Sequence, residues 1–339
     1  MPLTVAIVGC GNIARRHIAG YQHVEGAEFV AMCDLDESKA ANYAEEFGGR
    51  PYADVVTMLE TEAPDIVDVC TKEMHRDIPV IQSVSRGFTT LAEKPLFAAE
   101  GQFNVKPSDV EVGRRMVEAA QTGGGELFMA YNYRFGEYAM RLKRMIEGGE
   151  LGELQYVHAW TRLACWSHVI DLLRWFCGDI EAIAVSMSGP EDAKTRAGSL
   201  RFASGAVGTL LGEGVSPAFH DMLRIRWCGS EATAVLRDIA GGLEVYPRGE
   251  RQRTIIEQAH DDPRGEFMQT FHREVAALCD HVEHGAAVPL ATGEDGLREL
   301  EVDAGYVIAA ERGVWLELTQ DWQKIQGDQG GCSVAVNEG

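Results

Sequence analysis

The sequence predicts a two-domain α/β protein. Its first domain has a doubly wound parallel sheet, and its second is an α+β domain with a large, mostly antiparallel open sheet. Strand and helix patterns alternate over the first part of the chain, which is typical of parallel strands joined by right-handed helical crossovers. From residue 180 to residue 258, β-type runs follow one another without intervening helices, which indicates antiparallel pairing. A length of 339 residues is enough for two domains, each with its own hydrophobic core.

The first element is a buried-strand pattern at Thr4–Val8, which runs directly into a glycine-rich turn and a helical pattern. In that turn Gly9 permits a tight change of direction, Gly11 lets the backbone approach a pyrophosphate, and Ala14 lets the helix pack on the strand. The helix N-terminus offers free N–H groups and the positive end of its dipole. We therefore expect a Rossmann dinucleotide site, with an ordinary strand–helix turn as the alternative. Its predicted residues are Gly9, Gly11, Asn12, Ile13 and Ala14.

A second strand pattern, Phe29–Cys33, ends at Asp34, about twenty residues after the glycines. A carboxylate at this point accepts hydrogen bonds from the adenosine ribose and repels the 2′-phosphate of NADP. The residues that follow are Leu35 and Asp36 rather than Arg or Lys. The sequence therefore favours NAD over NADP.

The remaining elements follow from periodicity and from turn residues. In the first domain, residues 1–125, we expect helices at 13–24, 36–47, 75–86 and 108–120, and strands at 65–70 and 89–92. Ser108 and Glu111 predict a capping box for the last of these helices. In the second, residues 126–319, we expect helices at 137–147, 165–177, 267–284 and 293–312, and strands at 127–134, 154–163, 182–188, 199–202, 206–212, 222–228, 232–236, 243–246 and 314–318. The tail, 320–339, is Gly-rich and polar from Gly327, and we expect its end to be disordered.

Composition excludes several classes of partner. A formal net charge of −21 makes nucleic acid and anionic membranes electrostatically unfavourable partners. The eight cysteines show no Cys-x-x-Cys pair and lie mostly in apolar patterns, which indicates a reducing compartment. No metal site is predicted, because the one close histidine pair, His281 and His284, has no third ligand nearby. No signal peptide and no membrane-length apolar run are present, so we expect a cytoplasmic protein with a small-molecule substrate.

Two residues are candidates for proton transfer. Lys94 follows the strand at 89–92, at the sheet edge where ligands bind in doubly wound folds, and desolvation there makes a lysine a usable acid or base. His168 lies on a predicted helix with Asp171 on the same face, and histidine exchanges protons at neutral pH. The alternatives are a surface lysine that ends its strand and a core histidine satisfied by a neighbouring acid.

In their order along the chain, these motifs resemble those of the Gfo/Idh/MocA oxidoreductases, the relatives of glucose–fructose oxidoreductase and inositol dehydrogenase. The resemblance extends from about Leu3 to Leu318. The segments that carry it are Gly9–Ala14, Asp34, Glu93-Lys94-Pro95, Tyr131–Phe135, His168–Asp171 and Pro289–Gly296.

This resemblance implies hydride transfer between a nicotinamide and a carbinol carbon of a sugar, polyol or sugar derivative. It implies that Lys94 is the catalytic lysine, with Glu93 beside it, and that His168 lies near the nicotinamide and is followed by the acid Asp171. Thr71 and His75 correspond to residues that line the cofactor, although Lys72 replaces the usual proline between them. The open sheet of the second domain often packs against a partner subunit, so we expect a homodimer or homotetramer.

One departure concerns the substrate side of the site. Many members of the family carry an aspartate where this chain has Ala164, and without that negative charge Lys94 would hold its proton less tightly. Around this position, Arg162 and Trp166 are candidates to hold a carboxylate or a sugar face, with Tyr133 and Asp171 as further substrate residues. Core aromatic residues with a solvated arginine are the favoured alternative.

The departure keeps two other functions open. One is cleavage or elimination of a glycoside assisted by an NAD that stays bound and is recycled. The other is a dinucleotide-sensing regulator without catalysis, which the presence of both Lys94 and His168 disfavours. The sequence does not identify the substrate, the direction of the reaction or the size of the oligomer.

Overall fold

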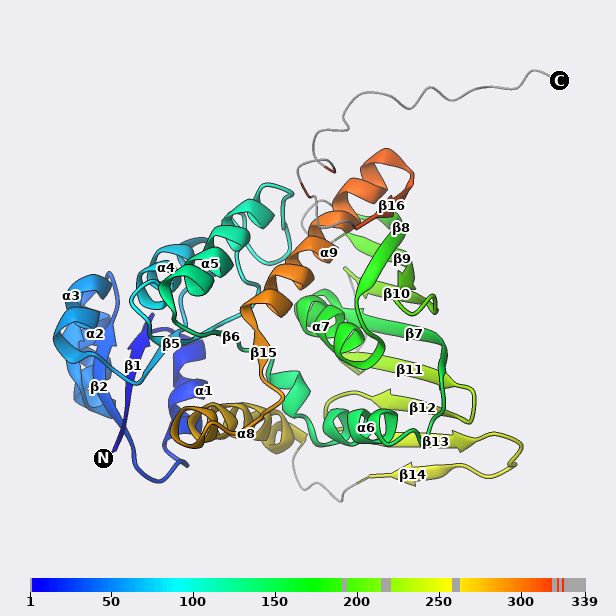
Figure 1. Ribbon diagram of the computed structural model, residues 1–339, viewed down its shortest axis with the longest axis horizontal. Helices are drawn as coiled ribbons and strands as arrows, with labels where there is room; N and C mark the ends of the chain where they lie inside the picture. Colours follow the sequence, from blue (N-terminus) through cyan, green and yellow to red (C-terminus); the bar gives the residue numbers. More distant parts are fainter. Residues whose placement is uncertain are drawn as a thin grey trace.

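The computed structural model describes residues 2–190, 194–214, 221–257, 263–318, 322 and 325. Two sheets lie side by side, a parallel sheet wrapped by helices and a larger, mostly antiparallel sheet, with the long helix α9 (Gly293–Arg312) running between them (Figure 1). The expected fold class is confirmed. In the part of the chain that is described, no helix combines the length and the apolarity that a membrane crossing requires.

The first sheet has the strand order β15-β6-β5-β4-β1-β2-β3, and β15 is its one antiparallel strand. All four residues of β4 are buried, because helices cover both faces of the sheet. The strands are β1 (Leu3–Val8), β2 (Ala27–Cys33), β3 (Arg50–Tyr52), β4 (Ile66–Val69), β5 (Thr89–Ala92), β6 (Leu127–Met129) and β15 (Ala291–Thr292). The helices are α1 (Asn12–Tyr21), α2 (Glu37–Phe47), α3 (Val55–Glu62), α4 (Asp77–Val84) and α5 (Asp109–Gly123), with a 3₁₀ turn η1 (Glu73–His75).

Three local expectations differ from the structure. The strand expected at 127–134 ends at Met129 and pairs with β5, so the first sheet extends beyond residue 125. The sequence analysis did not predict β3 and α3, which are short segments of three and eight residues. The capping box at Ser108 is wrong, because Ser108 has helical backbone angles and makes no capping bond. Asp109 instead accepts hydrogen bonds from the N–H groups of Lys106 (2.8 Å) and Ala99 (3.4 Å).

The second sheet has the order β14-β13-β12-β11-β7-β10-β9-β8-β16, and only β7 and β10 run parallel within it. Helices cover one face, and the other face carries exposed side chains. The strands are β7 (Leu154–Arg162), β8 (Ile180–Ser188), β9 (Thr195–Phe202), β10 (Val207–Glu213), β11 (Leu223–Gly229), β12 (Ala232–Arg237), β13 (Leu243–Pro247), β14 (Thr254–Ile256) and β16 (Trp315–Glu317). The helical segments are η2 (Asn132–Phe135), α6 (Glu137–Glu147), η3 (Leu163–Cys165), α7 (Trp166–Cys177), α8 (Pro263–His284) and α9.

The last two helices return to the first sheet and join the two halves of the molecule. On α8, Val275 packs against Gly20 of α1. The other helix, α9, begins with a capping box in which Thr292 and Asp295 bond each other's backbone N–H groups. It then packs on α5, where Gly113 leaves room for Leu300. The two helices therefore fix how the sheets face each other.

Of the tail, the structure describes Trp322 and Ile325, and both are buried. The Trp322 indole N–H donates a hydrogen bond to the carbonyl oxygen of Pro107 (3.1 Å). The disorder expected from Gly327 onward lies outside the described residues.

A buried ion pair ties η2 to α7. The Arg134 guanidinium donates two hydrogen bonds to Asp171, from Nε to Oδ2 (2.8 Å) and from Nη2 to Oδ1 (2.5 Å). A further carboxylate, Asp295, lies 3.4 Å from the same guanidinium. Arg134 and Asp171 are 4% and 0% exposed, so removal of Arg134 leaves the Asp171 carboxylate in the interior without the guanidinium that compensates its charge.

We expect Arg134→Met to lower the free energy of unfolding by about 3–5 kcal/mol, because Asp171 would then be buried without its partner. Urea denaturation measures this change. Arg201→Met, which breaks a pair on the surface with Glu317, is the control and should cost less than about 1 kcal/mol. Equal losses in the two variants would contradict the importance of burial.

Candidate active site

The glycine turn after β1 is fixed by its neighbours at the carboxyl end of the first sheet. Gly9 has a positive φ of 97°, and a Cβ there would lie 2.7 Å from the amide nitrogen of Thr71. The N–H of Gly9 donates to Cys33 O and that of Cys70 donates to Val8 O, both at 2.7 Å. The ends of β1, β2 and β4 are thus held together beneath the turn.

The start of α1 fits a dinucleotide phosphate. Gly11 is the N-cap, no side chain caps the helix, and its first turn contains no acidic residue. A Cβ built on Gly11 would meet nothing within 4 Å, whereas Ala14 is fully buried against the strand. Asn12 is exposed and Ile13 half-buried at this end of the helix. The first N–H groups of α1 are therefore available for a pyrophosphate.

Asp34 lies at the end of β2, where the sequence predicts the ribose site. Its Oδ2 accepts a hydrogen bond from the Cys10 N–H (2.8 Å), and its Oδ1 accepts one from the Asp36 N–H (2.9 Å). The carboxylate is half-buried, and Leu35 beside it is 86% exposed. Asp34 therefore shapes the glycine turn in addition to presenting a negative charge at its rim.

A buried histidine connects this turn to the predicted catalytic lysine. His17 of α1 lies between two acids: its Nδ1 is 2.9 Å from Asp68 Oδ2, and its Nε2 is 3.1 Å from Glu93 Oε1. Burial alone would lower the pKa of His17, but Asp68 and Cys70 raise it well above its ordinary value. Burial alone would raise the pKa of Glu93, and His17 instead lowers it to about 2. The pair is therefore held as imidazolium and carboxylate.

Sequence reasoning missed His17, although one signal was available. His17 occupies the buried face of α1, three residues after Ala14, and Asp68 is an acid inside a buried strand. Among the described residues, His17, Asp68 and Cys70 form a group of metal-ligand types. Both ring nitrogens of His17 already face carboxylates, so the group acts as a hydrogen-bonded network.

Lys94 follows β5, where a second buried cation shapes the loop. The Lys94 N–H donates to Glu93 Oε2 (3.0 Å), and Lys94 Nζ donates to Gln102 Oε1 (2.9 Å). Arg76, which the sequence did not single out, is 2% exposed and donates to the carbonyl oxygens of Thr71 and Pro95. Arg76 thereby joins the loop after β4 to the loop after β5. In the loop after β5, the Lys94–Pro95 peptide bond is cis.

His168 approaches from the second half of the molecule. Its ring stacks on Tyr133 with centroids 3.9 Å apart and meets the edge of Tyr131 at 5.9 Å. Burial, together with the positive charge of Lys94, lowers the pKa of His168 well below its ordinary value, so the imidazole is neutral at neutral pH. Its Nδ1 is buried and has no partner among the described residues. His168 is therefore a neutral ring held by two tyrosines of the second half of the molecule.

The remaining predicted residues lie at different depths. Thr71 is half-buried, and His75 is exposed in η1. Arg162 is half-buried at the end of β7, and the Tyr133 hydroxyl contacts Cys165 Sγ at 3.2 Å. Three expected substrate residues, Tyr133, Trp166 and Asp171, are buried. Trp166 packs on Tyr306 and beneath Gly212, and Asp171 is bonded to Arg134.

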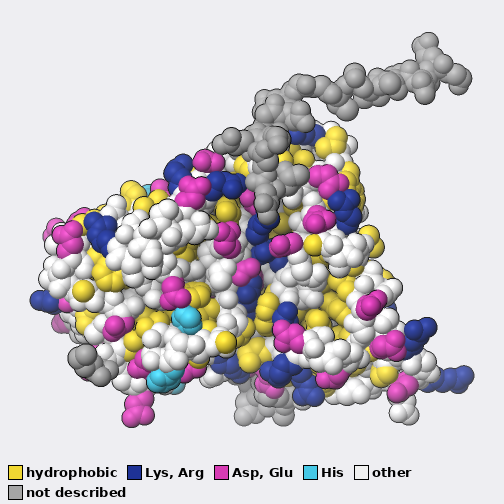
Figure 2. Space-filling view, viewed as in Figure 1, with side chains coloured by type: hydrophobic (Ala, Val, Ile, Leu, Met, Phe, Trp, Pro, Cys, Tyr) yellow, Lys and Arg dark blue, Asp and Glu magenta, His cyan; other side chains and the backbone are white. Residues whose placement is uncertain are grey.

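On the face shown in Figure 2, acidic and basic side chains are interspersed over both halves of the molecule. A parallel sheet with a glycine turn at its carboxyl edge, together with a lysine and a histidine from two lobes, defines a dinucleotide-dependent oxidoreductase.

The chain belongs to the Gfo/Idh/MocA oxidoreductase family. Residues 3–131 match the model described as "Oxidoreductase family, NAD-binding Rossmann fold", and residues 161–318 match "Oxidoreductase family, C-terminal alpha/beta domain". The predicted family and its NAD-binding domain are therefore confirmed.

Three similar proteins illustrate the range of the family. D-apiose dehydrogenase of Paraburkholderia graminis is 26% identical over 54% of this chain, and the match spans only 52% of that protein. Inositol 2-dehydrogenase 2 of Saccharopolyspora erythraea is 25% identical over 86% of this chain and 96% of its own. A levoglucosan dehydrogenase solved with NADH and L-sorbose has a TM-score of 0.80 at 18% identity, covering 94% of this chain and 100% of its own.

We expect His17→Gln to destabilise the protein in a pH-dependent way. Because the pKa of buried His17 is raised, its proton stabilises the fold fully below the ordinary pKa of 6.5, and this stabilisation is lost as the pH rises through the folded-state pKa. The difference in unfolding free energy between the wild type and the variant should be largest near about pH 6 and shrink in alkaline solution. Urea titrations at several pH values measure it, and a constant difference would contradict the charged pair.

Proposed function

We propose that this protein is an NAD-dependent dehydrogenase that acts on a carbinol carbon of a sugar, polyol or sugar derivative. The observation that carries the proposal is the glycine turn after β1, whose uncapped helix start and rim carboxylate Asp34 fit a dinucleotide, in a chain that matches both domains of the family. The names of the related apiose, inositol and levoglucosan dehydrogenases support this class of substrate.

In this proposal the chain supplies binding and proton transfer. NAD, when bound, exchanges a hydride at its nicotinamide ring. The first N–H groups of α1 hold its pyrophosphate, and Asp34 accepts from its ribose and disfavours the 2′-phosphate of NADP. Thr71, His75 and Glu93 line the cofactor side.

Lys94 or His168 takes the proton of the substrate hydroxyl as the hydride leaves. The Lys94 ammonium is on a flexible stem near Gln102, so it can reorient toward a substrate. His168 is neutral and rigidly stacked, which suits it to accept a hydrogen bond from the hydroxyl. Arg162 and Tyr133 are the proposed substrate contacts, supported from behind by Trp166 and Asp171.

We further propose a cytoplasmic homodimer or homotetramer that forms through the uncovered face of the second sheet. Large apolar side chains are exposed on this face, namely Tyr156 (44%), Val207 (55%) and Trp315 (45%). Contact with a second copy would remove them from water. Light scattering at working concentration tests this arrangement, and a monomeric mass would contradict it.

A substrate screen tests the proposed function. NAD reduction is followed by absorbance with sugars, inositols, sugar acids and glycosides, and NADP is run in parallel. Reduction of NAD by one substrate class, with NADP less effective, is the expected result. Silence across the panel, with NAD found in the purified protein, would instead favour recycled-cofactor cleavage or a sensor.

We expect Lys94→Ala to abolish turnover and leave NAD affinity nearly unchanged, because the side chain acts on the substrate proton. Lys94→Arg is the matched variant: it keeps the positive charge but does not release its proton, so it should be inactive too. Turnover and NAD binding are measured for both variants. Survival of more than about a tenth of the turnover, a change of under roughly 1.4 kcal/mol in barrier, would show that Lys94 is not the principal proton acceptor.

A further inference from the structure

The side chain of Lys94 has one hydrogen-bond partner among the described residues, and that partner is neutral. Its Nζ donates to Gln102 Oε1 at 2.9 Å. The neighbouring acid Glu93 is committed elsewhere, because its Oε1 faces His17 and its Oε2 accepts the backbone N–H of Lys94. The turn η3, between β7 and α7, carries no acid. Gln102 is therefore the residue that fixes the end of the lysine side chain.

The chemistry of this contact orients the lysine nitrogen in both of its protonation states. An ammonium has only N–H donors, so the amide atom of Gln102 that faces it must be the oxygen. A neutral amine still has N–H donors and also one lone pair, so it keeps the same hydrogen bond and its lone pair lies away from Gln102. A neutral amide thus directs the nitrogen without the ion pair by which a carboxylate would hold its proton.

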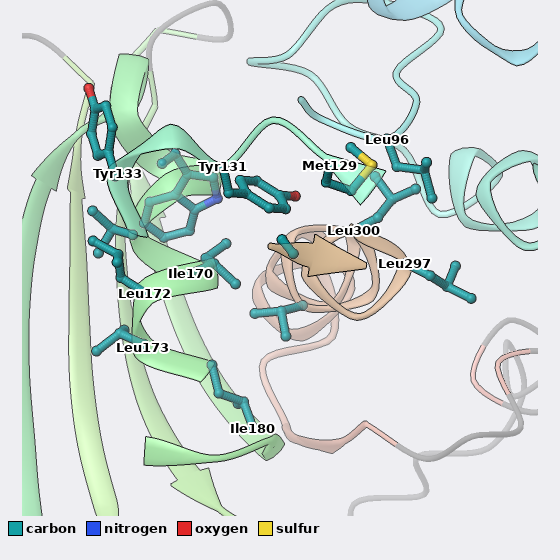
Figure 3. Close-up of a cluster of buried hydrophobic side chains, with 14 of the residues drawn as sticks. Leu96, Met129, Tyr131, Tyr133, Ile170, Leu172, Leu173, Ile180, Leu297 and Leu300 are labelled. Carbon is teal, nitrogen blue, oxygen red and sulfur yellow. The ribbon is translucent and has the colours of Figure 1, made fainter. Parts of the chain in front are cut away.

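Gln102 belongs to a long loop whose beginning is fixed in the core. Residues 93–108 separate β5 from α5, whereas most connections in compact domains have about 4–6 residues. Longer connections are often functional. Leu96, two residues after Lys94, is fully buried beside Leu297 and Leu300 of α9 (Figure 3). The loop therefore starts from a rigid point on the side of Lys94.

Two hydrogen bonds then fix the backbone at Gln102 itself. The Gln102 N–H donates to Glu73 Oε1 of η1, in the first half of the molecule (2.7 Å). The carbonyl oxygen of the next residue, Phe103, accepts from Arg196 of β9, in the second half (2.8 Å). Arg196 is itself buried and bonded to Asp303 of α9 (2.5 Å). The amide that meets Lys94 is thus held from both halves of the molecule.

We propose that Gln102 is a positioning residue for Lys94: its amide oxygen holds the lysine nitrogen so that the lone pair of the neutral amine is free for the substrate hydroxyl. This inference rests on the proposed role of Lys94. When the substrate O–H bond breaks, its proton forms a new N–H bond at Lys94 Nζ, and the hydrogen bond to Gln102 is unchanged. Gln102 acts through Lys94.

The first measurement follows Lys94 directly and needs no turnover. Competitive labelling of the full chain with acetic anhydride, read at Lys94 by mass spectrometry across neutral and alkaline pH, reports the fraction of neutral amine. In Gln102→Glu the midpoint of labelling should rise by about one pH unit, because a carboxylate in contact with the nitrogen favours the ammonium. In Gln102→Leu the midpoint should fall, because the ammonium loses its acceptor.

Asn104→Asp is the matched control. It makes the same change of charge in the same loop, but the side chain of Asn104 bonds Glu100 (2.5 Å) rather than Lys94. Its midpoint should move by less than about half of the shift in Gln102→Glu, since charge effects weaken with distance. Melting temperatures show whether each variant folds. If Gln102→Glu does not fold, Gln102→Asn, which keeps the amide on a shorter stem, should shift the midpoint as Gln102→Leu does.

The second measurement uses a substrate identified by the screen. Gln102→Leu should lower kcat by roughly 10- to 100-fold and leave the KM for NAD unchanged, because a misplaced amine reacts slowly while the cofactor contacts are intact. In Gln102→Glu the rising limb of the pH profile of kcat/KM should move to higher pH together with the labelling midpoint.

Unchanged midpoints in folded Gln102→Glu and Gln102→Leu proteins, or an equal shift in Asn104→Asp, would overturn the proposal, and so would full turnover by Gln102→Leu. Shifted midpoints in a protein that is silent across the substrate panel would support the hold of Gln102 on Lys94 and refute only the dehydrogenase function. The two failures are therefore distinguishable.

Discussion

The candidate site depends on His17, which lies between Asp68 and Glu93 in the interior of the first domain. Three ionisable groups without access to water are tolerated only when their charges and hydrogen bonds compensate one another, which restricts them to one geometry. That geometry fixes α1 against β4 and against the end of β5. The orientation of Glu93 is thereby set, and its second oxygen holds the backbone of Lys94. The glycine turn of the candidate cofactor site and Lys94, the proposed proton-transfer residue, are thus joined by one buried network.

The last two helices of the chain, α8 and α9, hold the second half of the molecule against this network. The contact of α8 with α1 and of α9 with α5 places the second sheet beside the first. Arg134 then joins η2 to α7 through Asp171, which holds His168 and its stacked Tyr133 in place. The Arg134–Asp171 pair is too deep to serve a ligand, and its effect is to set the position of the residues around it.

Local signals accounted for most of the fold and for part of the site. Gly9, Ala14, Asp34 and Lys94 were predicted because each belongs to a short motif at the end of a strand, where the backbone or the sheet edge limits the choice of residue. His17 was missed, since its role depends on partners that are 51 and 76 residues away in the sequence. The Tyr131 hydroxyl, which points toward the helix that carries Leu297 and Leu300 (Figure 3), likewise donates to Glu299, 168 residues away.

Trp166 and Asp171 were predicted as substrate residues, but both are buried. Helical spacing placed Asp171 on the face of His168, but spacing does not say which face of a helix meets solvent. Both side chains pack inward because the second sheet and α9 cover that side of α7, and neither contact has a local signature in the sequence.

The ionisable groups of the site differ in charge because they differ in burial and in their partners. Glu93 is held ionised by His17, with its pKa lowered to about 2 despite burial, and His168 is held neutral by burial and by the charge of Lys94. Asp171 is committed to Arg134. Neither Glu93 nor Asp171 can exchange a proton near neutral pH without losing its partner, so proton movement is confined to the remaining groups. The half-buried Lys94, whose ammonium lies beside Gln102, and the stacked His168 are the groups left to exchange a proton with a substrate in the proposed reaction.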